Sequence, residues 1–350
     1  MYQKQLLTNV VIIRLILIIL LVFYHAFAIF SGAWAPIDGY PDLHIYWWMD
    51  KLSYAFLLEM FVFISGYVFG YQVKTKGEAK LRAKNLLYSK FKRLIIPSMF
   101  FSLLYIILLK DFKQPLHRTI YDIFNGVAHM WFLPMLYWCF VGIWVIEFLK
   151  LKTTIILPLL ILISICSFIK IPLQINNAMY YMLFFYIGYY LQRNSINYER
   201  FYTKYNVILL FAAFLFLFSS MTFLCSNLNN IFDGLITDNL ILKVLKRVII
   251  TISKLVYSTT GLSALFVAVG CVDKRLSSQL PHWVVWVGEL SMGIYIFQQF
   301  ILKGLYNYTL LPSMFSPILM PWLGFVIALC LSLMLSFYFR KTSVGRFLIC

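Results

Sequence analysis

The stretch VIIRLILIILLVFYHAFAIF, residues 11–30, decides the fold class. It is long and apolar enough to cross a bilayer, since a spanning helix needs about 20 predominantly apolar residues. Similar runs recur along the chain, which is 62% hydrophobic and only 12% charged. A soluble domain is about one-quarter charged. We therefore predict an all-α, polytopic membrane protein.

Ten apolar segments are candidate spanning helices of a single integral-membrane domain over residues 1–350. They lie near residues 8–30, 52–72, 94–110, 130–149, 153–170, 178–192, 205–225, 248–270, 283–303 and 318–339. Most lysines and arginines fall in the loops that lie on the same side of the membrane as the N-terminus of such a bundle. The positive-inside rule then predicts that both termini are cytoplasmic. The net charge of +17 therefore reflects membrane topology, and we expect no nucleic-acid partner.

The largest of these inner loops is KTKGEAKLRAKNLLYSKFKR, residues 74–93. Its apolar positions Leu81, Leu87 and Phe91, together with Leu94 just after it, fall roughly on one helical face, which favours a basic amphipathic helix on the inner leaflet. Such a segment serves either as an anchor to lipid headgroups or as a landing site for a polyanionic cytosolic substrate. The six cysteines show no spacing typical of a metal site, and we expect no metal.

Two polar residues, Arg14 and His25, interrupt the opening apolar stretch. They are eleven residues apart, so on a helix they share a face, separated by about 16 Å along its axis. Charged groups at membrane depth are costly and usually face the protein interior or a hydrated cavity. The alternative is that Arg14 snorkels to the inner surface while His25 is a hydrogen-bonded packing residue.

The second apolar segment contains LLEMFVFISGYVFGY, residues 57–71. We expect Glu59 at a depth similar to His25, where a carboxylate orients an imidazole and raises its basicity. Ser65 and Gly66 fit tight helix packing at least as well as chemistry. Two further candidates are Arg93, which precedes Pro97, and His129 in AHMWFLPMLYW, residues 128–138.

Taken together, these stretches resemble the acyltransferase-3 family of integral-membrane O-acyltransferases. The resemblance rests on Arg14 and His25 in the first segment, on EMFVFISGY, KRLIIP and HMWFLPML, on GELSMGIYIFQQ at residues 288–299, and on the basic tail FRKTSVGRFL. These motifs occur in order along nearly the whole chain. Relatives often carry a histidine after Ser-x-x-Ile-Tyr, where this chain has Gln298 and Gln299. This departure shifts the expected catalytic role to His25, while glutamine still positions a hydroxyl by hydrogen bonds.

The resemblance implies an acyl-CoA donor, acetyl-CoA above all, and a carbohydrate or lipid-linked glycan acceptor such as a surface exopolysaccharide or its precursor. We expect Arg14 and Arg93 to hold the donor phosphates, and His25, oriented by Glu59, to act as general base. An acyl-imidazole intermediate is the alternative. His129, Ser65 or backbone N–H groups are candidates for stabilising the oxyanion.

A membrane transporter or flippase of a glycolipid or polysaccharide precursor is the main alternative, because such proteins also carry intramembrane charges. Against it, the sequence has no internal inverted repeat, and a purely structural scaffold leaves the shared face of Arg14 and His25 unexplained. We expect a multi-pass protein of a bacterial cytoplasmic membrane, in contact with membrane lipids. The sequence does not reveal the oligomeric state.

Overall fold

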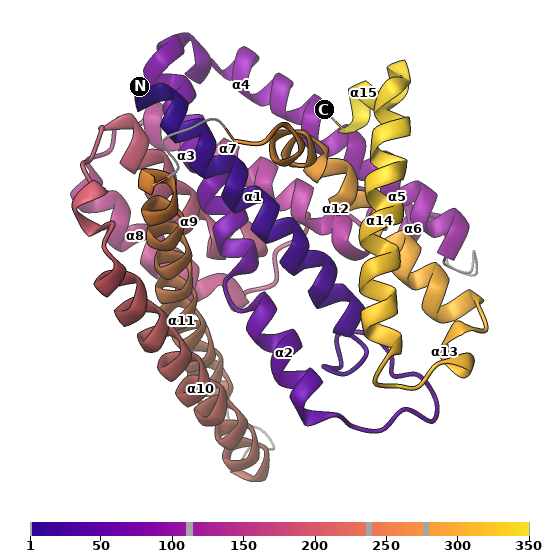
Figure 1. Cartoon of the computed structure of the whole chain (residues 1–350). Helices are drawn as coiled ribbons and strands as arrows, with labels where there is room; N and C mark the ends of the chain where they lie inside the picture. The colour runs from indigo at the N-terminus through magenta and orange to yellow at the C-terminus, as the bar shows by residue number, and fades with distance from the viewer. Residues whose placement is uncertain (1, 110–114, 236–239, 276–279, 350) are drawn as a thin grey trace. The chain divides into compact units, whose positions relative to one another are not determined.

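The computed structural model describes residues 2–109, 115–235, 240–275 and 280–349, so the last cysteine, Cys350, lies outside the described residues. Every regular secondary-structure element within these ranges is helical (Figure 1). The prediction of an all-α protein is confirmed.

Eight described helical segments are long and apolar enough to cross a membrane. They are Thr8–Phe27, His44–Lys76, Ala83–Leu109, Ala128–Phe148, Lys204–Leu228, Leu240–Asp273, His282–Tyr308 and Met320–Lys341. The polytopic membrane prediction is thereby confirmed. The predicted spans near residues 153–170 and 178–192 do not meet this criterion: Thr153–Phe168 is too short, and Ile175–Arg193 carries asparagines, glutamine and several tyrosines. The number of ten spanning helices and the cytoplasmic location of both termini stay predictions.

The chain divides into two compact units that alternate along the sequence. The first unit contains Met1–Asn9, Ala55–Ala83 and Trp138–Ser278; the second contains Val10–Tyr54, Lys84–Tyr137 and Gln279–Cys350. Helices α1 (Tyr2–Phe27) and α7 (Phe132–Phe148) run from one unit into the other. The expectation of one functional domain over residues 1–350 stays a prediction.

Helices α3 and α9 of the first unit pack backbone against backbone. The helices of this unit are α3 (Leu57–Lys76), α8 (Thr153–Ile165), α9 (Ile175–Arg193), α10 (Lys204–Leu235) and α11 (Leu240–Arg275). A Cβ on Gly66 would lie 2.1 Å from the carbonyl oxygen of Phe185, and one on Gly188 would lie 2.2 Å from that of Phe63. Only glycine permits this approach, so Gly66 serves helix packing as small residues do between membrane helices.

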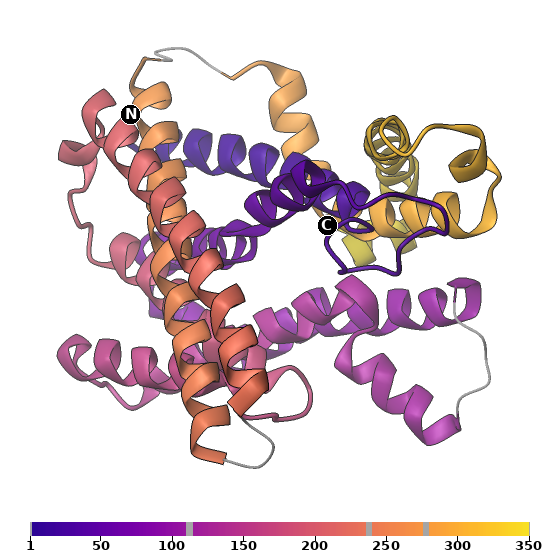
Figure 2. The same cartoon turned by 90° about the horizontal axis from the view of Figure 1, so that it is seen from below.

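Helices α10 and α11 form a long antiparallel pair, which lies side by side in both views (Figures 1 and 2). The end of α8 and the 3₁₀ turn Cys166–Phe168 that follows it also contact α11. Gly261 of α11 permits close packing against two phenylalanines. A Cβ on Gly261 would lie 2.6 Å from the ring of Phe56 and 2.8 Å from that of Phe214 on α10.

In the second unit, α12 lies against α14 (Figure 1). The helices of this unit are α2 (His44–Tyr54), α4 (Ala83–Lys90), α5 (Ile96–Leu109), α6 (Leu116–Asn125), α12 (His282–Tyr308), α13 (Leu311–Met314), α14 (Met320–Lys341) and α15 (Ser343–Ile349). Gly293 of α12 leaves room for Ser336 of α14, whose hydroxyl oxygen would lie 2.4 Å from a Cβ at that position. Val11 of α1 approaches Gly288 in the same way, at 3.1 Å.

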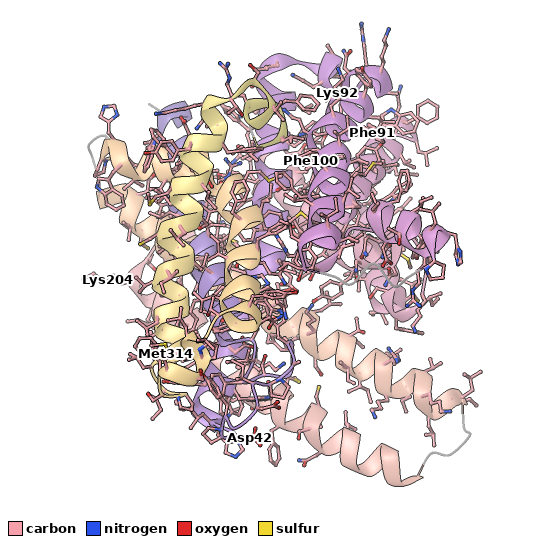
Figure 3. The ribbon with its side chains drawn as sticks, turned by 90° about the vertical axis from the view of Figure 1, so that its right-hand side faces the viewer. Asp42, Phe91, Lys92, Phe100, Lys204 and Met314 are labelled. Atoms are coloured by element: carbon pink, nitrogen blue, oxygen red, sulfur yellow. The ribbon has the colours of Figure 1, made fainter. Side chains whose placement is uncertain are left out.

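The basic segment 74–93 does not form one continuous helix. It contains the end of α3, a break at Gly77 with φ 77°, a 3₁₀ turn at Glu78–Leu81 and the short helix α4. A π-helical turn, Phe91–Ile95, then leads into α5; Phe91, Lys92 and Phe100 mark this region in Figure 3. Pro97 explains the turn, since it has no N–H to donate to the carbonyl of Arg93. Within this segment the continuous helical part therefore begins only at Ala83, and a basic amphipathic surface along the inner leaflet stays a prediction.

Candidate active site

His25 lies in the last turn of α1 and is held by Gln298 of α12. The side-chain nitrogen of Gln298 is 2.9 Å from Nδ1 of His25, and both residues are buried. The carbonyl oxygen of the same amide, Oε1, is buried without a hydrogen-bond partner among the described residues. Because Nδ1 is engaged by the amide, Nε2 is the ring nitrogen of His25 left for chemistry.

His129 lies in the 3₁₀ turn Ala128–Trp131, whose backbone is tied to α12. The N–H of His129 donates to Oε1 of Gln299 at 3.1 Å, and the Tyr295 hydroxyl donates to the carbonyl of His129. The ring nitrogen Nε2 of His129 lies 2.9 Å from the carbonyl oxygen of Ile296. Backbone and ring of His129 are therefore both fixed from the same helix.

The other side of this turn is tied to α5 by two serines that are fully buried. The N–H of Val127 donates to the Ser102 hydroxyl at 3.0 Å, and the Ser98 hydroxyl donates to the carbonyl of Met130 at 3.3 Å. Ala128, between them, has φ 51°, a left-handed conformation that is rare for alanine. Such conformations persist where the surroundings hold them, often at functional sites. The turn is thus a rigid platform for His129.

The contact with Ile296 defines which nitrogen of a neutral His129 carries the proton. A carbonyl oxygen only accepts, so Nε2 must donate to it. The neutral ring then has an unprotonated Nδ1, which is buried and without a hydrogen-bond partner in the described ranges. A neutral His129 thus accepts a hydrogen bond at Nδ1, whereas donation to an oxyanion, as predicted, requires a second proton on the ring.

The two imidazoles are neighbours in an aromatic environment. The ring centroids of His25 and His129 are 6.3 Å apart, and Trp34 stacks on His25 at 5.7 Å with an interplanar angle of 20°. The ammonium group of Lys303 lies 4.0 Å from the centroid of the Trp34 ring, a cation–π contact. Trp34 therefore contacts both a cation of α12 and the ring of His25.

A pocket of about 390 Å³ adjoins the turn that carries His129. It is lined by Tyr105, Leu109, Asp122, Gly126, Val127, Ala128, Lys303 and Asn307. Tyr105 links it to the histidines, because its ring centroid is 6.5 Å from that of His129. A carboxylate, an amide, an ammonium group and a phenol ring around one cavity suit a polar ligand that has an apolar face.

Arg14 lies eleven residues before His25 on the same continuous helix, and its side chain is half-buried. Within the described ranges, no ion pair of Arg14 is found. Arg93 is exposed in the π-helical turn before α5. The guanidinium of Arg93 is therefore accessible, whereas that of Arg14 is partly covered.

Glu59 forms an ion pair with a lysine of its own unit. It is buried in α3 of the first unit, where Lys254 of α11 pairs with it at 3.2 Å. The Lys254 ammonium group also lies 4.4 Å from the centroid of the Tyr180 ring. Glu59 thus pairs with Lys254, and His25 contacts Gln298, each within its own unit. The predicted partnership of Glu59 with His25 stays a prediction. Ser65, also in the first unit, donates its hydroxyl to the carbonyl of Phe61 at 2.8 Å.

Several participants in these contacts were not predicted as site residues from the sequence, among them Trp34, Lys303 and Lys254. A signal existed for Lys254, since it is a charge inside a predicted span and so requires a partner. The contacts of Trp34 and Lys303 depend on how the loop after α1 folds back onto α12, which no periodicity encodes.

A family model described as an acyltransferase domain matches residues 8–341 of the chain. No curated protein and no solved structure matches it.

Proposed function

The chain belongs to the acyltransferase family whose model spans residues 8–341, and we propose that it transfers an acetyl group from acetyl-CoA to a hydroxyl of a surface polysaccharide or its lipid-linked sugar precursor. The family membership makes it a membrane acyltransferase. The observation that carries the finer proposal is the pair of buried imidazoles of His25 and His129, both held by residues of α12.

In this proposal His25 is the general base. The acceptor oxygen forms a bond to the acyl carbon while its proton passes to Nε2 of His25. The bond between carbon and sulfur then breaks, and the departing thiolate takes the proton from the imidazolium. General-base catalysis of this kind contributes about 10² to 10⁴ in rate.

A base at Nε2 requires that Nδ1 of His25 carries a proton. Gln298 supplies the acceptor for that proton when its side-chain amide is rotated by a half-turn, which exchanges the amide nitrogen and oxygen. The carbonyl oxygen of the amide then faces Nδ1 of His25. The lack of a partner for this oxygen among the described residues supports the arrangement, which gives up only the long contact of 3.4 Å from the amide nitrogen to the carbonyl of Tyr295. Gln298 would then orient the imidazole as a carboxylate does in other catalytic sites.

We assign to His129 the orientation of the acceptor. Its unprotonated Nδ1 would accept a hydrogen bond from a hydroxyl of the sugar, and the rigid turn would fix the direction of that bond. The adjoining pocket would hold the rest of the sugar, with Asp122 and Asn307 bonding hydroxyls and Tyr105 contacting the apolar ring face.

The donor would be held by arginines. The guanidinium groups of Arg14 and Arg93 would bind the phosphates of coenzyme A through charge-assisted hydrogen bonds. We propose the cytoplasmic membrane of a bacterium as the location, with acetyl-CoA supplied from the cytoplasm.

The decisive experiment incubates the purified protein in nanodiscs with acetyl-CoA labelled on the acetyl group and a panel of soluble sugars. We expect release of free thiol together with a labelled, alkali-sensitive sugar ester. The His25→Ala variant should insert normally and release no thiol above background. A wild-type protein that releases no thiol but moves a labelled glycolipid between leaflets would instead be a transporter.

A further inference from the structure

Lys303 of α12 lines the pocket that we assign to the acceptor, and none of the steps above gives its ammonium group a role. The residue is half-buried. It lies four residues after Gln299, which accepts from the N–H of His129, and four residues before Asn307, which lines the same pocket. Residues at this spacing share one helical face. One stripe of α12 thus runs from the turn of His129 to the pocket, with a cation at its centre.

The ammonium group of Lys303 lies beside the aromatic rings of the candidate site. A lysine near the end of a spanning helix ordinarily extends its ammonium group to the lipid headgroups. Here the ammonium group instead lies 4.0 Å from the centroid of the Trp34 ring, and this ring stacks on that of the buried His25. Anchoring to lipid headgroups therefore does not explain the position of Lys303.

No carboxylate pairs with this ammonium group within the described ranges. Asp122 also lines the pocket, but it comes from a different helix, α6, and no ion pair joins it to Lys303 in the part of the chain that the structure describes. The face of an aromatic ring has no net charge, so Trp34 attracts the ammonium group without neutralising it. A partly buried cation of this kind attracts an anion more strongly than a cation in water does.

The position of Lys303 assigns this anion to the acceptor and not to the donor. Through Trp34 the ammonium group lies next to His25, in the last turn of α1. Arg14, which we assign to the donor phosphates, lies eleven residues earlier on the same helix, about 16 Å away along its axis. The cation thus lies at the end of α1 where the acceptor meets the base.

We propose that Lys303 determines acceptor specificity, and that the acceptor is an anionic sugar whose carboxylate or phosphate group pairs with the Lys303 ammonium group. This inference rests on the proposed function, because it takes the pocket beside His129 as the acceptor site. The ion pair and the bond to Nδ1 of His129 would fix the sugar at two points. Two fixed points determine which hydroxyl of the sugar meets His25.

The test first measures binding, so that it does not depend on catalysis. Methyl glycosides of glucuronic, galacturonic and mannuronic acid are each compared with their uncharged amide by saturation-transfer NMR of the full-length protein in phosphatidylcholine nanodiscs. The three corresponding hexoside 6-phosphates form a second arm, compared with the uncharged hexosides. We expect at least one anionic sugar to bind about 10- to 100-fold more tightly than its neutral counterpart, because a charged hydrogen bond strengthens binding by this much.

The two arms distinguish the source of the negative charge, because a preference confined to the acids indicates a carboxylate and one confined to the phosphates indicates a phosphate. Either preference supports the proposal when it depends on Lys303. Equal binding of the anionic and neutral members in every pair, or binding of neither, would overturn it.

Substitutions of Lys303 show whether the preference depends on its charge. Lys303→Met keeps a chain of similar length against Trp34 and should bind the anionic and neutral sugars equally, with binding of the neutral sugar unchanged. Lys303→Gln is a second neutral variant with the same expected result, whereas Lys303→Arg should keep the preference. Lys51→Met is the matched control, because the Lys51 ammonium group also lies over a tryptophan ring, 5.8 Å from the centroid of Trp47, but does not line the pocket. A preference that survives in both neutral variants, or that is lost equally in Lys51→Met, would contradict the proposal.

Steady-state acetyl transfer then separates a failure of this proposal from a failure of the proposed function. In Lys303→Met the KM for the anionic sugar should rise about 10- to 100-fold, while kcat and the KM for acetyl-CoA change by less than about threefold. A loss of kcat with anionic and neutral sugars alike, or a raised KM for acetyl-CoA alone, would give Lys303 a different role and overturn the proposal. A wild-type protein that binds the anionic sugar through Lys303 but transfers no acetyl group would instead refute the proposed function.

Discussion

Gln298 engages Nδ1 of His25 at 2.9 Å, so the ring that we assign as the base is oriented by an amide and not by a carboxylate. An amide has a donor end and an acceptor end, so it holds either neutral tautomer of the ring. The tautomer with the proton on Nδ1 is the one that leaves Nε2 free to accept a proton. The activity of His25 should therefore depend on the acceptor end of Gln298.

Gln298→Ala should lower kcat by about 10- to 100-fold with little change in KM for acetyl-CoA, since losing an orienting partner typically costs this much. Gln298→Glu keeps an acceptor for Nδ1 and should retain more activity than the alanine variant. Steady-state kinetics of thiol release measure both. An alanine variant with the wild-type kcat would show that the amide has no part in orienting the base.

His129 permits a comparison of its two ring nitrogens. The amide nitrogen of His129→Gln takes the place of Nε2 and keeps the bond to Ile296, whereas the amide oxygen of His129→Asn takes the place of Nδ1. If Nδ1 orients the acceptor, the asparagine variant should keep more transfer activity. It should also lose about 1 kcal/mol of unfolding free energy with the bond to Ile296. Greater activity in the glutamine variant would contradict the assignment.

The sequence predicted the parts of this structure that follow from hydropathy, and missed those that depend on side-chain partners. Apolar runs predicted the helical membrane class and the one helix that carries both Arg14 and His25. The contact of His25 with Gln298 was not predicted, because depth alone suggested Glu59 and the amide of Gln298 lies far away in sequence. The turn at His129 was not predictable either, since it depends on five hydrogen bonds to two helices.

Arg14 provides a test of how the donor is held. Arg14→Ala should raise KM for acetyl-CoA more than KM for the sugar, because the guanidinium is assigned to the phosphates of the donor alone. Losing charge-assisted bonds to phosphate should raise the donor KM by about 10- to 100-fold. Dephosphorylated coenzyme A thioesters, compared with the parent donor, supply the control. Equal effects on both substrates would count against the phosphate role.

Glu59 and Lys254 should behave as a structural pair. Removing one partner leaves a buried charge, so Lys254→Met should lower the unfolding free energy by about 3–5 kcal/mol. The double variant with Glu59→Gln should recover much of this loss, which a double-mutant cycle measured by chemical unfolding in detergent would detect. If the refolded double variant transfers acetyl groups at the wild-type rate, Glu59 has no direct catalytic role.

The close approach of α3 and α9 gives the sharpest prediction for stability. A Cβ on Gly70 would lie 2.4 Å from the carbonyl oxygen of Tyr189, and backbone atoms cannot move aside as a flexible side chain does. Gly70→Ala should therefore force the two helices apart and lower the unfolding free energy by about 1–3 kcal/mol.

Gly304 on α12 is the matched control, because a Cβ there meets no atom within 4 Å. Gly304→Ala should stabilise its helix by about 0.5–1 kcal/mol, since alanine loses less backbone entropy than glycine. Thermal unfolding of both variants in the same detergent, followed by tryptophan fluorescence, should therefore move the midpoint in opposite directions. A Gly70→Ala midpoint equal to or above that of Gly304→Ala would contradict a backbone contact at this position.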